Sequence, residues 1–230
     1  MEQEDYSKIY EYESMGKEYS GERACISLTS WKARINTVSK TLYSLIKMCP
    51  GFHIVLVLSK DEFPLKEKEL PENLMLFVNN KLIELFWIKP NLKSFKKVLF
   101  TMDKYRDVPV ISADDDCIYT CNYAQELYDK WTENKNSPVI YRNIKITYYM
   151  QGPCSLYPPK LFKLLIKKFN YAEWLDKGDD DYYSKIFKDN EIKICKTENI
   201  CYPCIFHDEI SPLHGSKNRL DWLKALPKIG

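Results

Sequence analysis

Residues 108–119 read VPVISADDDCIY, so three consecutive aspartates, Asp114 to Asp116, directly follow a short apolar run. The run Val108–Ser112 has the length and the β-branched composition of a buried strand. Ligands of parallel sheets bind beyond the carboxyl ends of the strands. The aspartates are therefore predicted to stand at the mouth of a binding site.

Strands and helices alternate on either side of this stretch, which predicts a mainly parallel sheet with crossover helices and hence an α/β fold. The first half is Rossmann-like, and the second half has an α+β character. The expected strands are Ala24–Ser30, His53–Ser59, Lys81–Ile88, Val108–Ser112, Val139–Thr147 and Ile192–Cys195. The expected helices are Val38–Cys49, Pro71–Val78, Phe95–Tyr105, Tyr123–Lys135, Pro158–Phe169, Tyr182–Phe187 and Asn218–Leu226.

The first 22 residues carry seven acidic side chains and no sustained apolar period. They are predicted to be a polar tail or a loosely docked helix, and residues 23–230 to be one domain.

Composition excludes several classes of protein. Lys and Arg number 34 against 32 Asp and Glu, so the formal charge is +2 and we expect no nucleic-acid partner. The acidic opening argues against a secretory leader, so we expect the eight cysteines to be reduced and the protein to be cytoplasmic. The longest apolar run, Ile54–Leu58, is too short to span a membrane, so contact with one would be peripheral at its inner face.

Three adjacent carboxylates repel one another, and a hard divalent cation with oxygen ligands, Mn²⁺ or Mg²⁺, offsets that repulsion. We predict Asp114 and Asp116 as metal ligands. The alternative is a turn at the strand end in which the aspartates cap the next helix. The sequence has neither a glycine-rich dinucleotide fingerprint nor a phosphate loop, and it lacks the Gly-x-Ser-x-Gly elbow. Dehydrogenase, ATPase and serine hydrolase activities are therefore unsupported.

Several short segments occur in the order found in bacterial GT-A type glycosyltransferases, and the chain resembles that family from about Cys25 to Asp181. The segments are Ile26–Ser30, Leu58–Ser59, Glu62–Pro64, Ser94–Lys97, Asp114–Tyr119 and Leu156–Pro159. The resemblance implies a GT-A domain that binds a nucleotide-sugar, a UDP-sugar first of all, through a divalent metal at the Asp-x-Asp motif.

The same resemblance assigns donor-binding residues. It places the base and ribose at Thr29, Ser30 and Arg34, and the rest of the donor near Lys97, Asp114 and Asp115. For Lys97 the alternative is a solvated helix face.

A second acidic cluster follows Gly178. The resembled family carries a pair of acids here, so Asp180, with its neighbours Asp179 and Asp181, is predicted to supply the catalytic base that deprotonates the acceptor hydroxyl. The alternative is that these acids only cap the helix that they begin.

The fragment His214-Gly215-Ser216-Lys217 resembles the C-terminal histidine region of GT-A enzymes. It implies His214 as a third metal ligand and Lys217 as a partner of the departing diphosphate, with His207 as a competitor and a surface loop as the alternative. Cys201 and Cys204 have the spacing of half a zinc site, but the fourfold ligand set is incomplete in sequence, which favours reduced thiols.

These features predict a metal-dependent transfer of a sugar from a nucleotide-sugar, and the resemblance alone implies a saccharide or lipid-linked saccharide of a surface glycan as the acceptor. The Gly178–Asp181 cluster favours inversion, whereas the His214 fragment resembles retaining enzymes; we give the acidic cluster more weight. Two alternatives use the same residues: a metal-dependent nucleotidyltransferase or phosphatase, and a non-catalytic saccharide-binding protein on this fold.

Overall fold

The computed structural model describes residues 11–141, 150, 152–167, 178–198 and 204–206. Within them an eight-stranded mixed sheet has the order β1-β4-β3-β2-β5-β8-β7-β9. Its strands are β1 Glu11–Gly16, β2 Cys25–Thr29, β3 His53–Ser59, β4 Glu84–Lys89, β5 Val110–Ser112, β7 Val139–Ile140, β8 Ser155–Tyr157 and β9 Cys195–Lys196.

The centre of the sheet is parallel, as predicted. β2 pairs in parallel with β3 and with β5, and β3 pairs in parallel with β4. All seven residues of β3 are buried, because helices cover both faces of the sheet. Parallel strands end at the same edge, so the loops that follow β2, β3, β4 and β5 converge there.

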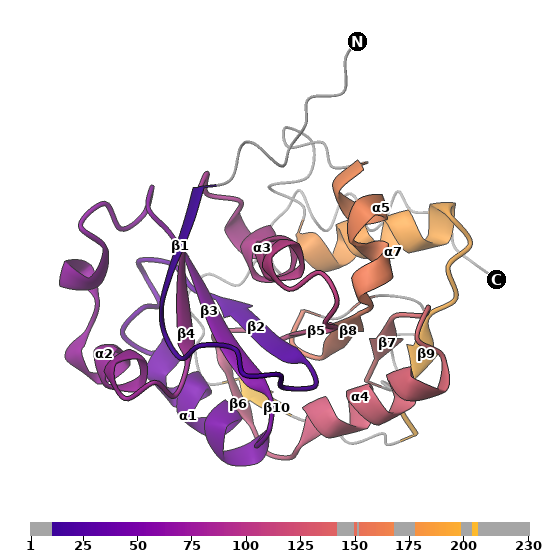
Figure 1. The fold of residues 1–230 in the computed structure, drawn as a ribbon, viewed down its shortest axis with the longest axis horizontal. Helices are drawn as coiled ribbons and strands as arrows, with labels where there is room; N and C mark the ends of the chain where they lie inside the picture. The colour runs from indigo at the N-terminus through magenta and orange to yellow at the C-terminus, as the bar shows by residue number, and fades with distance from the viewer. Residues whose placement is uncertain (1–10, 142–149, 151, 168–177, 199–203, 207–230) are drawn as a thin grey trace, which may run out of the picture.

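Helices lie on both sides of the sheet (Figure 1). The described helices are α1 Val38–Met48, α2 Glu72–Asn79, α3 Lys96–Lys104, α4 Tyr123–Glu133, α5 Phe162–Lys167 and α7 Asp179–Asp189, with the 3-10 turns η2 Lys66–Glu69, η3 Lys93–Phe95 and η4 Pro159–Leu161. One core joins α1, α2 and α4 to one face of the sheet, and a second core joins α3, α5 and α7 to the opposite face.

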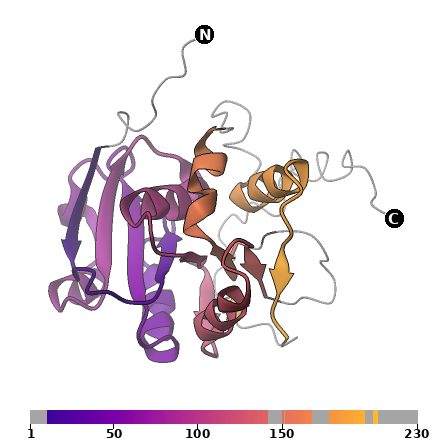
Figure 2. The same cartoon turned by 45° about the vertical axis from the view of Figure 1, so that its right-hand side comes forward.

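The N-terminal tail predicted for residues 1–22 is wrong for Glu11–Gly16, which form β1. This strand pairs antiparallel with β4, from Glu11 opposite Lys89 to Gly16 opposite Glu84. Figure 2 shows β1, in indigo, at the edge of the sheet. It lies at the edge of the sheet, where Glu13 is exposed and pairs with Lys60 at 2.8 Å. An edge strand with a polar outer face lacks the apolar alternation by which strands are recognised in sequence.

The second half departs further from the prediction. The described part of the expected strand 139–147 is only β7, and the helix expected from Pro158 begins as the 3-10 turn η4. The helix expected at 218–226 lies outside the described residues. A second, two-stranded sheet was not predicted: β6 Cys117–Tyr119 pairs antiparallel with β10 Cys204–Phe206, so Phe206 lies opposite Cys117, the residue after Asp116.

Candidate active site

A pocket of about 370 Å³ lies at the carboxyl edge of the parallel strands. Thr29 ends β2, Glu62 follows β3, Asn91 follows β4 and Asp114 follows β5. The start of α7 contributes Gly178, Asp179 and Asp180 to the same pocket. The full lining is Thr29, Ser30, Trp31, Arg34, Glu62, Asn91, Lys93, Ser94, Lys96, Lys97, Asp114, Asp115, Asp116, Gly152, Gly178, Asp179 and Asp180.

Asp115 joins the loop after β2 to the loop after β5. Its carboxylate accepts hydrogen bonds from Ser30 Oγ at 2.6 Å and from Arg34 Nη1 at 2.8 Å, and its carbonyl accepts one from Thr41 Oγ1 at 2.9 Å. Burial raises the pKa of Asp115, and the hydrogen bonds from Ser30 and Arg34 oppose that rise. Three residues predicted to bind the donor thus also hold each other, which fixes the shape of this wall.

Asp114 and Asp116 project from the same loop. Arg34 Nη1 lies 3.1 Å from Asp116 Oδ2, and the Cys117 thiol lies 3.6 Å from Asp116 Oδ1. Burial, and next the negative charge of Asp114, raise the pKa of Asp116. The two carboxylates are therefore close enough to repel each other, and a cation at this loop would relieve that repulsion.

Gly152 lies directly beside Asp114 and was not predicted. A Cβ atom at this position would lie 2.6 Å from Asp114 Oδ2, closer than real Cβ contacts. Because Gly152 has no side chain, there is open space beside Oδ2 of Asp114. In sequence, a glycine before Pro153 indicates only a turn.

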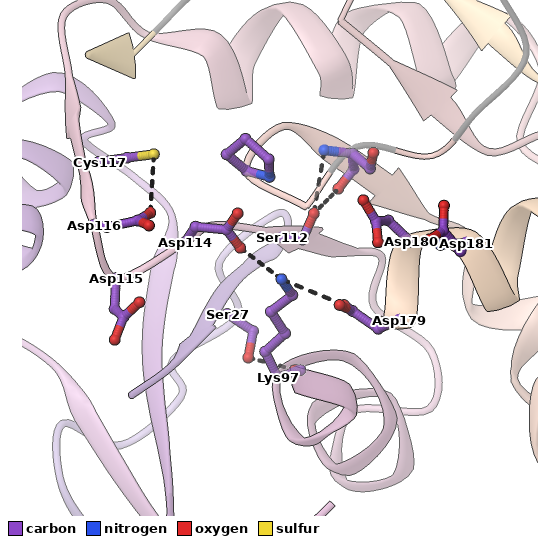
Figure 3. A network of polar contacts seen from close by, with 12 residues as sticks. Ser27, Lys97, Ser112, Asp114, Asp115, Asp116, Cys117, Asp179, Asp180 and Asp181 are labelled. Atoms are coloured by element: carbon purple, nitrogen blue, oxygen red, sulfur yellow. Dashed lines mark hydrogen bonds and ion pairs between the residues drawn. The ribbon is translucent and has the colours of Figure 1, made fainter. Parts of the chain in front are cut away.

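Lys97 lies beneath Asp114 rather than on a solvated helix face. Its ammonium is 2.6 Å from Asp114 Oδ1 and 3.3 Å from Asp179 Oδ2, as Figure 3 shows. The residue is 3% exposed. Burial acts to lower the pKa of Lys97, but the carboxylates of Asp114 and Asp179 outweigh it and raise the pKa well above its usual range.

The three acids of the second cluster have different surroundings. Asp179 is 4% exposed, and burial raises its pKa to about 6 against the opposing charge of Lys97. Asp181 is also 4% exposed and does not line the pocket, which argues against the catalytic role predicted for it. Asp180 is partly exposed and lines the pocket, so it is the accessible carboxylate of the three.

Gly178 sets the direction in which α7 begins. Its φ of +95° lies in the left-handed region that favours glycine, and no side chain caps the helix there. The acids therefore occupy the first turn, where the positive end of the helix dipole stabilises negative charge. The Oδ1 atom of Asp180 accepts the backbone N–H of Asp181 at 3.1 Å.

The balance of charge decides what the pocket can accept. Among the described residues that line it, six carboxylates stand against four cationic side chains. A dianionic diphosphate would meet net repulsion here, and a divalent cation would offset it.

The donor set also fits such a cation, because both Asp114 and Asp116 offer the oxygen ligands that Mn²⁺ and Mg²⁺ prefer. Within the described residues no three His, Cys, Asp or Glu side chains form a complete metal cluster. Further ligands would come from a bound diphosphate, from water or from other residues. His207, His214, Lys217 and Cys201 lie outside the part of the chain that the structure describes.

Solved structures share this architecture at low sequence identity. GalNAc-T7 with UDP, GalNAc and Mn²⁺ matches with a TM-score of 0.55 and 13% identity, over 76% of this chain and 42% of that one. The mannosyltransferase PcManGT from Pyrobaculum calidifontis, in complex with GDP-Man and Mn²⁺, matches with a TM-score of 0.58 and 12% identity, over 84% of this chain and 59% of that one. S. aureus TarS 1-349 matches with a TM-score of 0.52 and 12% identity, over 77% of this chain and 59% of that one.

The chain has the GT-A fold. It spans between 42% and 59% of the length of these structures. No family model and no curated protein sequence matches it. None of the described helices has both the length and the apolar character needed to cross a bilayer.

Proposed function

We propose that this GT-A domain is a glycosyltransferase that moves a sugar from a nucleotide-sugar to a saccharide acceptor in a metal-dependent reaction. One observation carries the proposal: Asp114, Asp116 and the accessible Asp180 line a single pocket at the carboxyl edge of the sheet. The two acidic clusters, far apart in sequence, thus line one space that is large enough for a ligand.

Donor binding requires both the pocket walls and a cation. Thr29, Ser30 and Arg34 would contact the base and ribose of the donor, a UDP-sugar being the first to test. Asp114 and Asp116 would hold Mn²⁺ or Mg²⁺, with Asp115 fixing their loop. A bound cation supplies positive charge that stabilises the departing nucleoside diphosphate.

Asp180 is proposed as the base. It would take the proton of the acceptor hydroxyl while that oxygen forms a bond to the anomeric carbon, and the bond from this carbon to the diphosphate oxygen breaks. Attack from the face opposite the leaving group inverts the anomeric configuration. The partial exposure of Asp180 supports this role, because the acceptor must reach it.

The acceptor is proposed to be a saccharide or lipid-linked saccharide of a surface glycan. The enzyme would then act at the cytoplasmic side, with peripheral contact at the inner face of the membrane.

We also propose His214 as a third metal ligand and Lys217 as a contact of the diphosphate. The position of β10 supports this, since Phe206 lies opposite Cys117, and residue 214 follows it by eight positions. Eight extended residues reach at most about 28 Å. His214→Ala should weaken Mn²⁺ binding in the presence of UDP more than His207→Ala does, and the reverse order in calorimetry would transfer the role to His207.

A panel of nucleotide-sugars with Mn²⁺ tests the function, read by thermal shift and by slow donor hydrolysis. The matching donor should raise the Tm in the wild type, and Asp116→Asn should abolish this metal-dependent rise without unfolding the protein. Release of phosphate or pyrophosphate in place of nucleoside diphosphate would instead indicate the phosphoryl-transfer alternative. Glycan binding without donor consumption would indicate a saccharide-binding protein.

A further inference from the structure

We propose that Lys97 is a positioning residue that ties the cation side of the pocket to the base side, rather than a ligand of the donor. The proposal rests on the function given above. Its basis is the bridge that one ammonium group makes between Asp114, after β5, and Asp179, in the first turn of α7.

The geometry leaves Lys97 little capacity for a donor. Its ammonium is already in contact with two carboxylates, at 2.6 Å and 3.3 Å, and the residue is 3% exposed. Two of its three N–H donors are thus directed at carboxylates, which leaves one N–H for any other partner. Figure 3 shows the Lys97 ammonium between these two carboxylates.

The bridge affects the cation side first. Lys97 occupies Asp114 Oδ1, so a cation would approach Asp114 through Oδ2, the oxygen next to the open space at Gly152. The Lys97 ammonium also places a positive charge close to Asp114, and this charge repels a metal ion that binds there. Lys97 thus lowers the affinity for the metal ion and at the same time fixes the orientation of the Asp114 carboxylate.

The bridge affects the base side through α7. Asp179 is the residue before Asp180, so fixing Asp179 against Lys97 fixes the turn that presents Asp180. The backbone of Lys97 is held against β2, because its carbonyl accepts a hydrogen bond from the buried Ser27 Oγ at 2.6 Å. A rigid connection therefore runs from β2 through α3 to both acidic clusters.

Lys97→Met tests the proposal, since it keeps the length of the side chain and removes the charge. Electron paramagnetic resonance of Mn²⁺ alone should show binding about tenfold tighter than in the wild type, because a neighbouring positive charge is gone. With a donor, kcat should fall about 100-fold and the donor KM should stay within threefold, because alignment is lost while donor contacts remain.

The neighbouring residue provides the matched control. Lys96 is also buried, on the same helix and in the same pocket, but it pairs with Glu62 at 2.8 Å. Lys96→Met should therefore leave the Mn²⁺ affinity within threefold of the wild type. Lys97→Arg, which can still bridge two carboxylates, should restore the wild-type Mn²⁺ affinity and part of kcat.

The outcomes separate the possible roles. A tenfold or larger rise in donor KM with unchanged kcat would make Lys97 a donor ligand and overturn the proposal. Unchanged Mn²⁺ affinity in Lys97→Met would overturn it as well. If Lys97→Met does not fold, Lys97→Met/Asp179→Asn removes the unpaired buried carboxylate, and the Mn²⁺ measurement decides on that variant.

Failure of the proposed function is distinguishable from failure of this inference. If no donor is consumed by the wild type, the Mn²⁺ titration still applies because it needs no donor. Tighter binding in Lys97→Met then supports the role of Lys97 at Asp114, and unchanged binding refutes it.

Discussion

Gly152→Ala probes the space beside the free oxygen of Asp114. The added Cβ would lie 2.6 Å from Asp114 Oδ2 and 3.2 Å from Oδ1, whereas ordinary contacts begin at 3.4 Å. Asp114 would have to move by roughly 0.8 Å to restore an ordinary contact. Lys97 holds Asp114 Oδ1 at 2.6 Å and resists that movement.

A displacement of this size is large for a group that is proposed to hold the cation, since about 1 Å of misplacement can cost about 100-fold in rate. We therefore expect Gly152→Ala to weaken Mn²⁺ binding at least about tenfold and to lower turnover by about 100-fold. The φ of Gly152 does not lie in the left-handed region, so alanine suits its backbone, and overpacking should cost about 1–3 kcal/mol of stability.

Paramagnetic resonance of free Mn²⁺ and urea unfolding are the two measurements. Gly21→Ala is the matched control, because its Cβ would meet no atom within 4 Å while its φ of +93° strains any other residue. It should lower stability by about 1 kcal/mol without changing Mn²⁺ binding. Wild-type Mn²⁺ affinity in Gly152→Ala would refute the reasoning. An equal loss of Mn²⁺ affinity in Gly152→Ala and Gly21→Ala would show that a change of the backbone, and not the contact with Asp114, weakens Mn²⁺ binding.

Three further changes test other parts of the pocket. Asp180→Asn should lower kcat by about 10²–10⁴-fold with little change in donor KM, and proton NMR of the product should show inversion; a retained anomeric configuration would contradict the assignment of the base. Asp179→Asn should raise the free energy of unfolding by about 1–3 kcal/mol at pH 7.5, and this gain should disappear near pH 4. The pKa of Asp179 is raised to about 6 in the folded protein, so the acid ionises less readily there than in the unfolded chain. Its ionisation therefore destabilises the folded protein as the pH rises from about 4 to above 6. Equal differences in urea unfolding at the two pH values would exclude this origin. Arg34→Met should cost about 3–5 kcal/mol, because it leaves the buried Asp115 carboxylate without its cation. Lys32→Met removes an exposed ion pair with Glu69 and should lower the free energy of unfolding by less than about 1 kcal/mol. A similar loss in Arg34→Met and Lys32→Met would show that the buried pair of Arg34 with Asp115 stabilises the protein no more than an exposed pair does.

The sequence determined the parallel core of the fold. The apolar run His53–Ser59 is β3 with the same bounds, and the helix stripe that begins at Val38 is α1. A parallel strand that is buried on both faces requires a continuous apolar run, and such a run can be recognised in a short stretch of sequence. The aspartates after β5 were predictable for the same reason, because the strand before them sets their edge of the sheet.

Only the tertiary structure decided which partners these residues have. β1 becomes a strand through its hydrogen bonds to β4, and its polar residues carry no local signal of that pairing. Asp181 and Asp180 are adjacent in sequence, yet one is buried and the other faces the pocket, because each successive residue of a helix turns to a different side.

The same distinction separates the predicted from the unpredicted parts of the site. Residue types that bind a cation are visible in sequence, so Asp114 and Asp116 could be predicted as candidate ligands. The contact of Gly152 with Asp114 and the bridge from Lys97 to Asp179 join segments that come together only when the sheet and its helices pack. Short-range patterns specify elements and their chemistry, whereas distances across a pocket arise from long-range packing, which no local pattern encodes.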